Sequence, residues 1–508
     1  MKSNMQLTCP LILMRMGGLD GVAMQKKEYR HLLNSIDISV HAITGLLEKE
    51  FDTPDPIGHR ETIIPELDFY HPDSQLLFAN QFTEGDEKEG IEEISDSEWL
   101  TLLEKHKEII KNAIDSVLQK IPNNTPVIVY NLVSLRHAQP AAALALKELI
   151  EKYPNRGFLS HAADPDAERP EKIARIKEHC LKKISCKPED QPYSGGPYNA
   201  NNLYHIVLNP IQRNNFINKY NIPENHIFEI PDFMQFASST PQILPQPKEI
   251  FLNFLAGQRV KPNGTSYQYE HERNNNAEVD SDTIFFLSPV RPVYRKQLKE
   301  AMVVAKQYAI SRNKKVAFVV THPNIDDKVY FQKTVEFADA LNLDYYHLGE
   351  RFTLKTLDYV YENMAPMNTI GLVASNAGGW ENALNEMAHA SIPFFMNNKL
   401  NSFKPITEKI GIKTFGTDFM DPQNLMNNKS PEELATKDFS DTEEFRKLFE
   451  WIDSSLNKQI RNELITYNYA KAYKWLSQKA TAPRLMEAIL YIYSRHGLPG
   501  QPGEAVIP

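Results

Sequence analysis

Cysteine and long apolar runs are scarce in this chain of 508 residues. Its three cysteines, Cys9, Cys180 and Cys186, show no paired spacing and no zinc-binding pattern. So sparse and odd a set excludes a disulfide framework and indicates a reducing compartment. The apolar run at residues 11–14 is too short for the core of a signal peptide or a membrane span. We therefore expect a cytoplasmic protein without a transmembrane segment.

Basic residues are fewer than acidic ones, with 56 lysines and arginines against 65 aspartates and glutamates. The formal net charge is −9, and no basic run of five or more residues occurs. This balance argues against a surface that coats nucleic acid, but it leaves room for one anionic ligand. The strongly acidic stretch at residues 82–98 is best explained as a solvated insertion or helix face.

The length of the chain exceeds the size at which a single hydrophobic core stops growing, so two domains are expected. Strand-like and helical patterns alternate through both halves, which is typical of parallel α/β units. Proline and polar residues dominate at 238–247, where we expect the chain to cross between domains. Glycine and proline at 497–508 predict a disordered tail.

The two halves are expected to repeat one pattern. Strands are predicted at residues 10–16, 38–43, 126–130 and 205–209 in the first half, and at 283–287, 316–321, 345–348, 368–376 and 414–416 in the second. Helices are predicted at 138–152, 295–312 and 328–342, with a helical tail over 444–496. Residues 258–281 are expected to form a long polar loop.

A glycine turn followed by a helix is the most informative segment. Gly378 and Gly379 let the backbone approach a ligand before a helix that begins near Trp380. Such a helix end binds phosphate through its unpaired N–H groups and dipole. Glu386, about one and a half turns into the helix, is placed to accept hydrogen bonds from a sugar or ribose. The alternative is an ordinary glycine-started helix with a solvated glutamate.

A basic segment follows the predicted strand at 283–287. Arg291, Arg295 and Lys296 place fixed positive charge at the start of a helix. Guanidinium groups grip phosphate through paired bonds, and a diphosphate leaving group needs such charge as its bond to the sugar breaks. A solvated basic helix start is the alternative interpretation.

Two weaker features lie at the ends of strands in the first half. Gly17, Gly18 and Gly21 follow the first strand but lack the full dinucleotide-binding spacing, so a simple tight turn fits equally well. His161 stands in a block rich in carboxylates that also contains Arg169, a mixture suited to sugar hydroxyls. A lone histidine is more often structural than catalytic.

The order of these segments resembles the retaining glycosyltransferases of the GT-B fold, family 4, from about residue 11 to 490. The resemblance implies an α/β protein with two Rossmann-like domains that face a central cleft and with C-terminal helices crossing back. The acceptor domain would span residues 1–240, with helices from about 465–496 packing back on it. The nucleotide-sugar donor domain would span 241–464.

The resemblance also implies roles for the candidate residues. Arg291 and Lys296 would hold the diphosphate, and His161 would position the donor sugar. The glycine loop of Gly17, Gly18 and Gly21 would face the donor. The family's acidic motif has a glutamate at each end, and the chain keeps Asn382 and the second glutamate, Glu386, which would contact ribose. Gly378, beside Gly379, stands where the first glutamate would be, and Glu381 is expected to take over its role.

The expected activity is therefore retaining transfer of a hexose from a UDP- or GDP-sugar to an unidentified acceptor, which would be a sugar, a small molecule, a lipid or a protein. No tightly bound cofactor, no metal and no nucleic-acid partner are expected. One alternative is another GT-B enzyme, such as a phosphorylase or an epimerase. Another is a catalytically impaired protein that binds sugar nucleotides.

Overall fold

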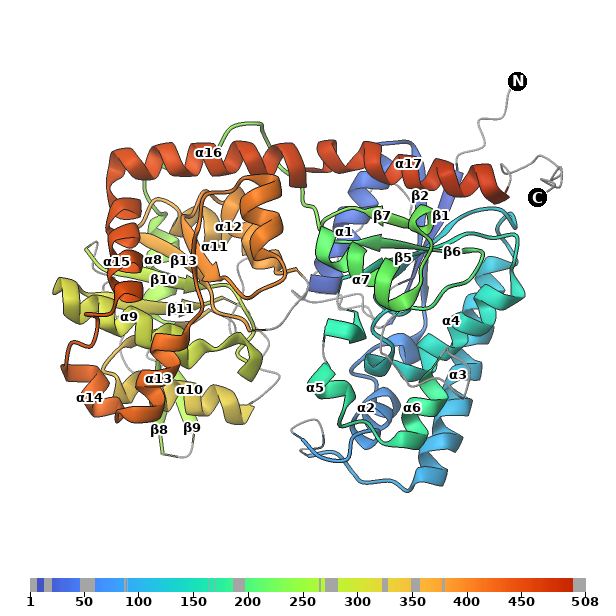
Figure 1. The fold of residues 1–508 in the computed structure, drawn as a ribbon, viewed down its shortest axis with the longest axis horizontal. Helices are drawn as coiled ribbons and strands as arrows, with labels where there is room; N and C mark the ends of the chain where they lie inside the picture. Colours follow the sequence, from blue (N-terminus) through green and yellow to red (C-terminus); the bar gives the residue numbers. More distant parts are fainter. Residues whose placement is uncertain are drawn as a thin grey trace. The chain divides into compact units, whose positions relative to one another are not determined.

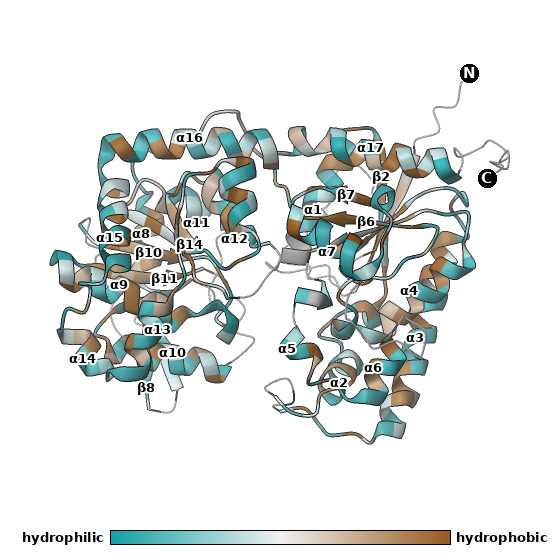
Figure 2. Ribbon diagram, viewed as in Figure 1, coloured by the Kyte–Doolittle hydropathy of each residue, from teal (hydrophilic) through white to brown (hydrophobic). Residues whose placement is uncertain are grey.

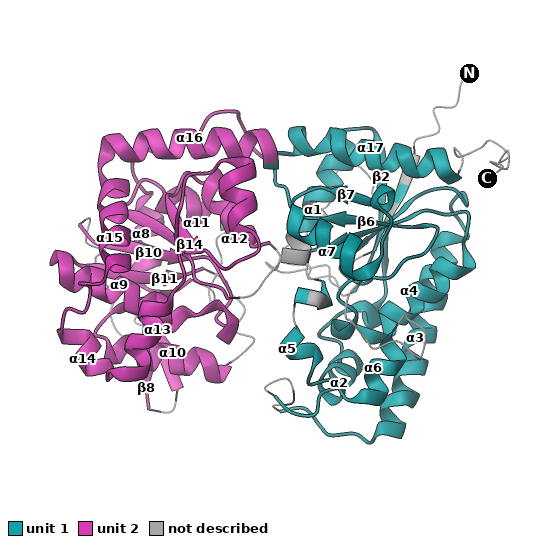
Figure 3. Cartoon of the chain, in the orientation of Figure 1, with its two compact units in different colours: residues 1–235, 476–508 teal, residues 236–475 magenta. Residues whose placement is uncertain are grey.

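The computed structural model divides the chain into two compact units. It describes residues 7–12, 21–45, 60–85, 88, 90–163, 165–168, 170–185, 197–264, 266–269, 282–321, 328–348, 357–376 and 380–496. Unit 1 comprises residues 1–235 and 476–508, and unit 2 comprises residues 236–475 (Figure 3). The chain thus leaves the first unit, forms the second and returns to the first.

Unit 1 is built on a seven-stranded sheet of order β3-β2-β1-β4-β5-β6-β7 in which every pairing is parallel. Its strands are β1 (Leu7–Ile12), β2 (Ile38–Thr44), β3 (Arg60–Ile63), β4 (Val127–Tyr130), β5 (Phe158–Ala162), β6 (Leu203–Val207) and β7 (Ile227–Glu229). Strands β4, β5 and β6 are buried along their whole length, as expected where helices cover both faces of a parallel sheet. The order of the first six strands is that of the Rossmann fold.

The helices of unit 1 are α1 (Gly21–Asn34), α2 (Pro72–Asn80), α3 (Asp96–Leu118), α4 (Pro140–Lys152), α5 (Pro170–Ile173), α6 (Glu178–Ile184), α7 (Pro210–Tyr220) and α17 (Gln478–His496). Some of these helices lie against the sheet, and others, among them α2, α3 and α6, pack mainly on neighbouring helices (Figure 1). Helix α3 packs on α4, and α1 packs on α17. A capping box at Ser95 and Glu98 fixes the start of α3, so the acidic stretch at 82–98 ends as a helix cap.

Unit 2 repeats the plan with a six-stranded parallel sheet of order β12-β11-β10-β13-β14-β15. The strands are β10 (Ile284–Ser288), β11 (Val316–Val320), β12 (Asp344–His347), β13 (Thr369–Val373), β14 (Phe394–Asn397) and β15 (Phe415–Thr417). Its helices are α8 (Glu249–Ala256), α9 (Leu298–Arg312), α10 (Lys328–Ala340), α11 (Leu357–Met364), α12 (Asn382–His389), α13 (Met420–Asn428), α14 (Pro431–Thr436), α15 (Glu443–Leu456) and α16 (Lys458–Leu476). Figure 2 shows brown, apolar residues along β10 and teal, polar residues on the outer helices, the pattern of a buried parallel sheet.

The predicted long loop at 258–281 is wrong in its first part. Residues Val260–Asn263 form β8 and Ser266–Tyr269 form β9, an antiparallel hairpin. Gly264 is the reason, because it lies between the paired residues Asn263 and Ser266 at the end of the ladder and has a φ of +62°, which a glycine at the first position of a tight hairpin turn adopts readily. Val260 and Tyr269 at the base of the hairpin are buried.

The predicted helical tail at 444–496 is three helices, α15, α16 and α17. The return to unit 1 falls at Leu476 rather than near residue 465. Helix α16 remains bound to unit 2, because Arg461 donates hydrogen bonds to the carbonyls of Thr369 and Ala365 and Asn468 bonds the backbone of Lys413. In the described part of the chain, no helix has the length and apolarity needed to cross a membrane.

Candidate functional site

The sheet of unit 2 reverses its strand order between β10 and β13, which are neighbours. From β10 the chain builds outward through β11 and β12, and from β13 it builds the other way through β14 and β15. Open α/β sheets bind ligands outside the carboxyl ends of the strands at such a switch point. The basic segment follows β10 and the glycine turn follows β13, so both predicted elements lead from this point.

Lys296 and Glu381 form a buried ion pair at the switch point. The Lys296 ammonium lies 2.5 Å from one carboxylate oxygen of Glu381, and both residues are buried. The guanidinium of Arg295 lies 3.6 Å from the other oxygen. The N–H of Asn376, after β13, donates to the carbonyl of Arg295 at 3.1 Å, which joins the two segments.

The local backbone presents Lys296 to this site. The predicted helix at 295–312 is interrupted, because Tyr294–Lys296 form one turn of 3-10 helix and Gln297 then adopts a left-handed φ of 49°. Only at Leu298 does α9 begin. Lys296 is therefore the last residue of a tight turn and not a solvated residue of a long helix.

Positive charge is concentrated at this site. Burial is the main cause that lowers the pKa of Lys296 from 10.5 to about 8, and repulsion from Arg295 and Arg291 lowers it further, while Glu381 acts in the opposite direction. A bound anion would relieve the repulsion between these cations.

Several buried polar atoms without hydrogen-bond partners belong to the segments that follow β10 and β13. Among the described residues, none donates to or accepts from the hydroxyls of Ser288 and Ser375, the second carboxylate oxygen of Glu381 or the amide oxygen of Asn382. An unsatisfied buried polar group costs about 1–3 kcal/mol. Such a concentration at one strand edge is typical of a site that a ligand or water completes.

Glu386 lies on α12, which begins at Asn382, two residues later than predicted. Its carboxylate accepts a hydrogen bond from the Tyr361 hydroxyl of α11. Trp380 donates through its indole N–H to Asn385 at 3.1 Å, which holds the segment before the helix. Gly378 and Gly379 lie outside the described residues.

His161, at the end of β5 in unit 1, is completely buried. Its Nδ1 lies 2.6 Å from the Tyr29 hydroxyl of α1, and its Nε2 lies 3.1 Å from Asp232. Burial and the charge of Asp232 raise the pKa of Tyr29 well above its usual range. The hydroxyl therefore keeps its proton and donates to Nδ1. Both ring nitrogens lie close to the protein's own groups, and a contact of His161 with the donor sugar stays a prediction.

The glycine loop is described only where it ends. Gly21 is the first residue of α1, the helix that carries Tyr29 to His161, while Gly17 and Gly18 lie outside the described residues.

A second buried histidine in unit 1 is absent from the predicted site. His137 and Asp166 are 2.5 Å apart and both are buried. The N–H of Asp166 also bonds the carbonyl of Ser134, after β4. The acidic block around Asp166 was visible in the sequence, but its partner lies 29 positions away, where only the fold brings it near.

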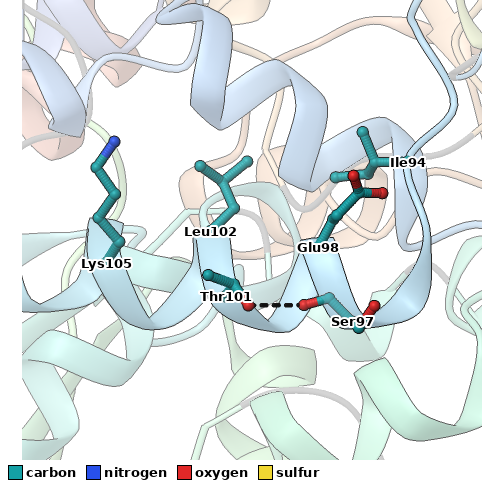
Figure 4. Close-up of a pocket in the computed structure, with 6 residues that line it drawn as sticks. All are labelled: Ile94, Ser97, Glu98, Thr101, Leu102 and Lys105. Atoms are coloured by element: carbon teal, nitrogen blue, oxygen red, sulfur yellow. Dashed lines mark hydrogen bonds between the residues drawn. The ribbon is translucent and has the colours of Figure 1, made fainter.

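One surface hollow lies along the first turns of α3 (Figure 4). Its volume is about 380 Å³, and it is lined by Ile94, Ser97, Glu98, Thr101, Leu102 and Lys105. No lining residue is buried, and the Thr101 hydroxyl donates to the backbone of Ser97 within the helix. It lacks the convergent buried polar groups of a binding site.

Comparison with known proteins is informative only at the level of structure. No protein-family model and no curated protein matches the sequence. A glycosyltransferase from Rickettsia africae is 12% identical to this chain, with a TM-score of 0.56. The match covers 96% of this chain and 98% of the Rickettsia protein. Sucrose-phosphate synthase from Thermosynechococcus elongatus is 11% identical with a TM-score of 0.57, covering 96% and 100%. S. aureus TarM, solved with UDP, is 10% identical with a TM-score of 0.55, covering 95% and 99%.

These likenesses extend over nearly the whole of each chain, so they include both Rossmann-like units and the C-terminal helices. At such identities they establish the fold and not the activity. The protein has the fold of the GT-B glycosyltransferases.

Proposed function

We propose that the protein is a glycosyltransferase that moves a hexose from a UDP- or GDP-sugar to an acceptor with retention of configuration. The observation that carries the proposal is the cluster of Arg291, Arg295 and Lys296 at the switch point of unit 2, where Arg295 and Lys296 both approach Glu381. Clustered cations of this kind suit a diphosphate. The complex of TarM with UDP is consistent with that ligand class. The scarcity of cysteine favours a cytoplasmic location.

In the proposed reaction, Arg291 and Lys296 bind the diphosphate and stabilise the charge that develops as it leaves. The bond between the sugar's anomeric carbon and the phosphate oxygen breaks, and the acceptor oxygen bonds to that carbon from the same face. The acceptor's proton passes to the departing phosphate oxygen. With these cations around the diphosphate, the proposed site calls for no metal.

Glu386 is proposed to bind ribose, and the start of α12, with Asn382, lies beside the phosphates. Glu381 would exchange part of its contact with Lys296 for the donor, because its second carboxylate oxygen and the Ser288 hydroxyl have no hydrogen-bond partner among the described residues. His161 is assigned a supporting role through Tyr29 and Asp232.

A panel of nucleotide sugars tests this proposal by thermal unfolding. A ligand that binds the native state raises the unfolding temperature by mass action. One nucleotide class is expected to stabilise the protein and to be hydrolysed slowly without an acceptor. Absence of any shift across UDP- and GDP-sugars would contradict the proposal.

A second candidate, a sugar-nucleotide-binding protein with impaired catalysis, is favoured by one observation. Glu381, the residue expected to replace the missing first glutamate, is held by Lys296. Binding without hydrolysis or transfer across the same panel would favour this candidate. Release of a sugar phosphate when inorganic phosphate is added to a glycoside would point instead to a phosphorylase.

A further inference from the structure

Two histidines and an aspartate that the proposed reaction does not use meet in unit 1. His71 is the N-cap residue of α2, Asp73 lies in the first turn of α2, and His106 lies in the middle of α3. One nitrogen of each imidazole and one carboxylate oxygen lie within 4.8 Å of one another. The histidines are 35 positions apart, so they show no metal-binding spacing in the sequence.

His106 is oriented as a metal ligand would be. Its side chain is fully buried, and its Nε2 lies 3.1 Å from the carbonyl of Glu66 and 3.2 Å from the Ser74 hydroxyl. A carbonyl only accepts, so the proton sits on Nε2 and Nδ1 carries the lone pair. Metal-binding histidines are commonly fixed in this way by a carbonyl on the far nitrogen.

The Nδ1 atom of His106 is the unexplained group in the cluster. It is buried, has no hydrogen-bond partner among the described residues, and lies 3.9 Å from a carboxylate oxygen of Asp73. Two acceptors, a bare imidazole nitrogen and a carboxylate, thus face each other with no proton between them. A cation placed between them would satisfy both.

His71 completes the set from the start of α2. Its ring centre is 5.2 Å from that of His106, and its Nδ1 accepts the N–H of Asp73 at 3.2 Å. This cap bond shows that Nδ1 is also unprotonated. A metal bound there would replace a hydrogen bond worth about 1 kcal/mol. His71 and Asp73 are both partly exposed, which gives an ion a path from solvent.

We propose that His71, Asp73 and His106 form a binding site for Zn²⁺. Two imidazoles and one carboxylate, with water as the fourth ligand, are a recognised zinc donor set. Bonds of about 2.0–2.2 Å in a tetrahedron hold ligands roughly 3.3 Å apart, so the cluster would close slightly around the ion. The ion would tie the start of α2 to the middle of α3 and thereby stabilise unit 1, independently of sugar transfer in unit 2.

The test uses the untagged full-length protein, stripped with a chelator and dialysed against Zn²⁺ or Co²⁺. The expected result is one ion bound per chain, with Co²⁺ giving the visible absorption of a tetrahedral nitrogen and oxygen site and with a raised unfolding temperature. Failure to retain stoichiometric metal at micromolar concentration would overturn the proposal.

His71→Asn is the sharpest variant, because asparagine is a strong N-cap residue and keeps α2 intact while removing the imidazole. It is expected to weaken zinc binding at least about tenfold and to abolish the cobalt spectrum, with the apo unfolding temperature little changed. Asp73→Asn should do the same without disturbing the buried His106. His179→Asn is the matched control, since His179 faces Asp96 at 3.5 Å without a second histidine. Equal zinc affinity in the wild type and His71→Asn would refute the assignment.

Discussion

Buried charged groups stand at the carboxyl edges of both sheets, but they differ in kind. In unit 1, His161 lies between Tyr29 and Asp232, and His137 is paired with Asp166. In unit 2, Lys296 and Glu381 are paired, and Arg295 and Arg291 add positive charge that acts on the lysine. Both edges keep buried polar atoms without hydrogen-bond partners among the described residues, such as His161 Nε2 in unit 1 and the Ser288 hydroxyl in unit 2. The clustered cations, and not the unsatisfied atoms, therefore make the edge of unit 2 the one suited to an anion.

The largest difference is expected from replacing Lys296. Lys296→Ala should weaken nucleotide diphosphate binding by more than about a hundredfold and abolish donor hydrolysis, since a charged contact to phosphate is lost. It should also destabilise the fold by about 3–5 kcal/mol, because Glu381 is left buried without its partner. Calorimetric titration and denaturant unfolding measure the two effects.

A double variant separates these effects. Lys296→Met with Glu381→Leu replaces the buried pair by apolar groups, a change that is often neutral for stability. It should therefore unfold like the wild type while binding no nucleotide. Normal binding in this variant would remove the distinction between the two units.

The second prediction concerns pH. The folded pKa of Lys296 is lowered from 10.5 to about 8, so the free site loses its proton as pH rises through 8. Affinity for a nucleotide diphosphate should be constant below pH 8 and fall about tenfold per unit above it, with proton uptake on binding. Lys296→Arg keeps its charge and should flatten the profile. An unchanged slope in Lys296→Arg would show that another group titrates.

The lowered pKa of Lys296 also determines how the stability of the protein changes with pH. Between pH 8 and 10.5 the unfolded chain binds more protons at this lysine than the native protein does, so this lysine's contribution to stability increases as pH rises over that window. Denaturant midpoints of the wild type and of the double variant across this window report the difference.

The third prediction tests the buried histidine network of unit 1. Tyr29→Phe removes the hydroxyl that bonds His161 and leaves Nδ1 buried without a donor. We expect a loss of about 1–3 kcal/mol of unfolding free energy, with nucleotide affinity unchanged. A marked loss of affinity at wild-type stability would instead make His161 part of the binding machinery.

The smallest effect is expected at Glu386. Glu386→Gln should weaken binding of a ribonucleotide by a few-fold, because a neutral amide is a weaker acceptor for ribose hydroxyls. Tyr361→Phe, which removes the other partner of this carboxylate, is the control for indirect effects. A 2′-deoxynucleotide should be less sensitive to Glu386→Gln, and equal sensitivity would place the ribose elsewhere.

Much of the fold was accessible from the sequence. The runs Ile284–Leu287 and Val316–Val320 are apolar throughout, so β10 and β11 of unit 2 were predicted within one residue. The return of the chain at Leu476 was harder to predict, because it depends on hydrogen bonds that Arg461 and Asn468 make to distant backbone groups.

The sequence predicted which residues form the candidate site, but not which of them pair with one another. The basic segment and the acidic helix were both identified, yet nothing in the sequence pairs Lys296 with Glu381, which lies 85 positions away. For the same reason, the sequence does not show that His106 lies close to His71. Local patterns specify strands and turns, whereas pairing of buried charges is decided only when the sheet order brings strand ends together.

Calorimetric titration of UDP and GDP into the wild type, Tyr29→Phe and the Lys296→Met, Glu381→Leu double variant tests the central claim most directly. We predict that one nucleotide binds the wild type and Tyr29→Phe with equal affinity and that neither binds the double variant. Equal binding to all three proteins would contradict a nucleotide site at the switch point of unit 2.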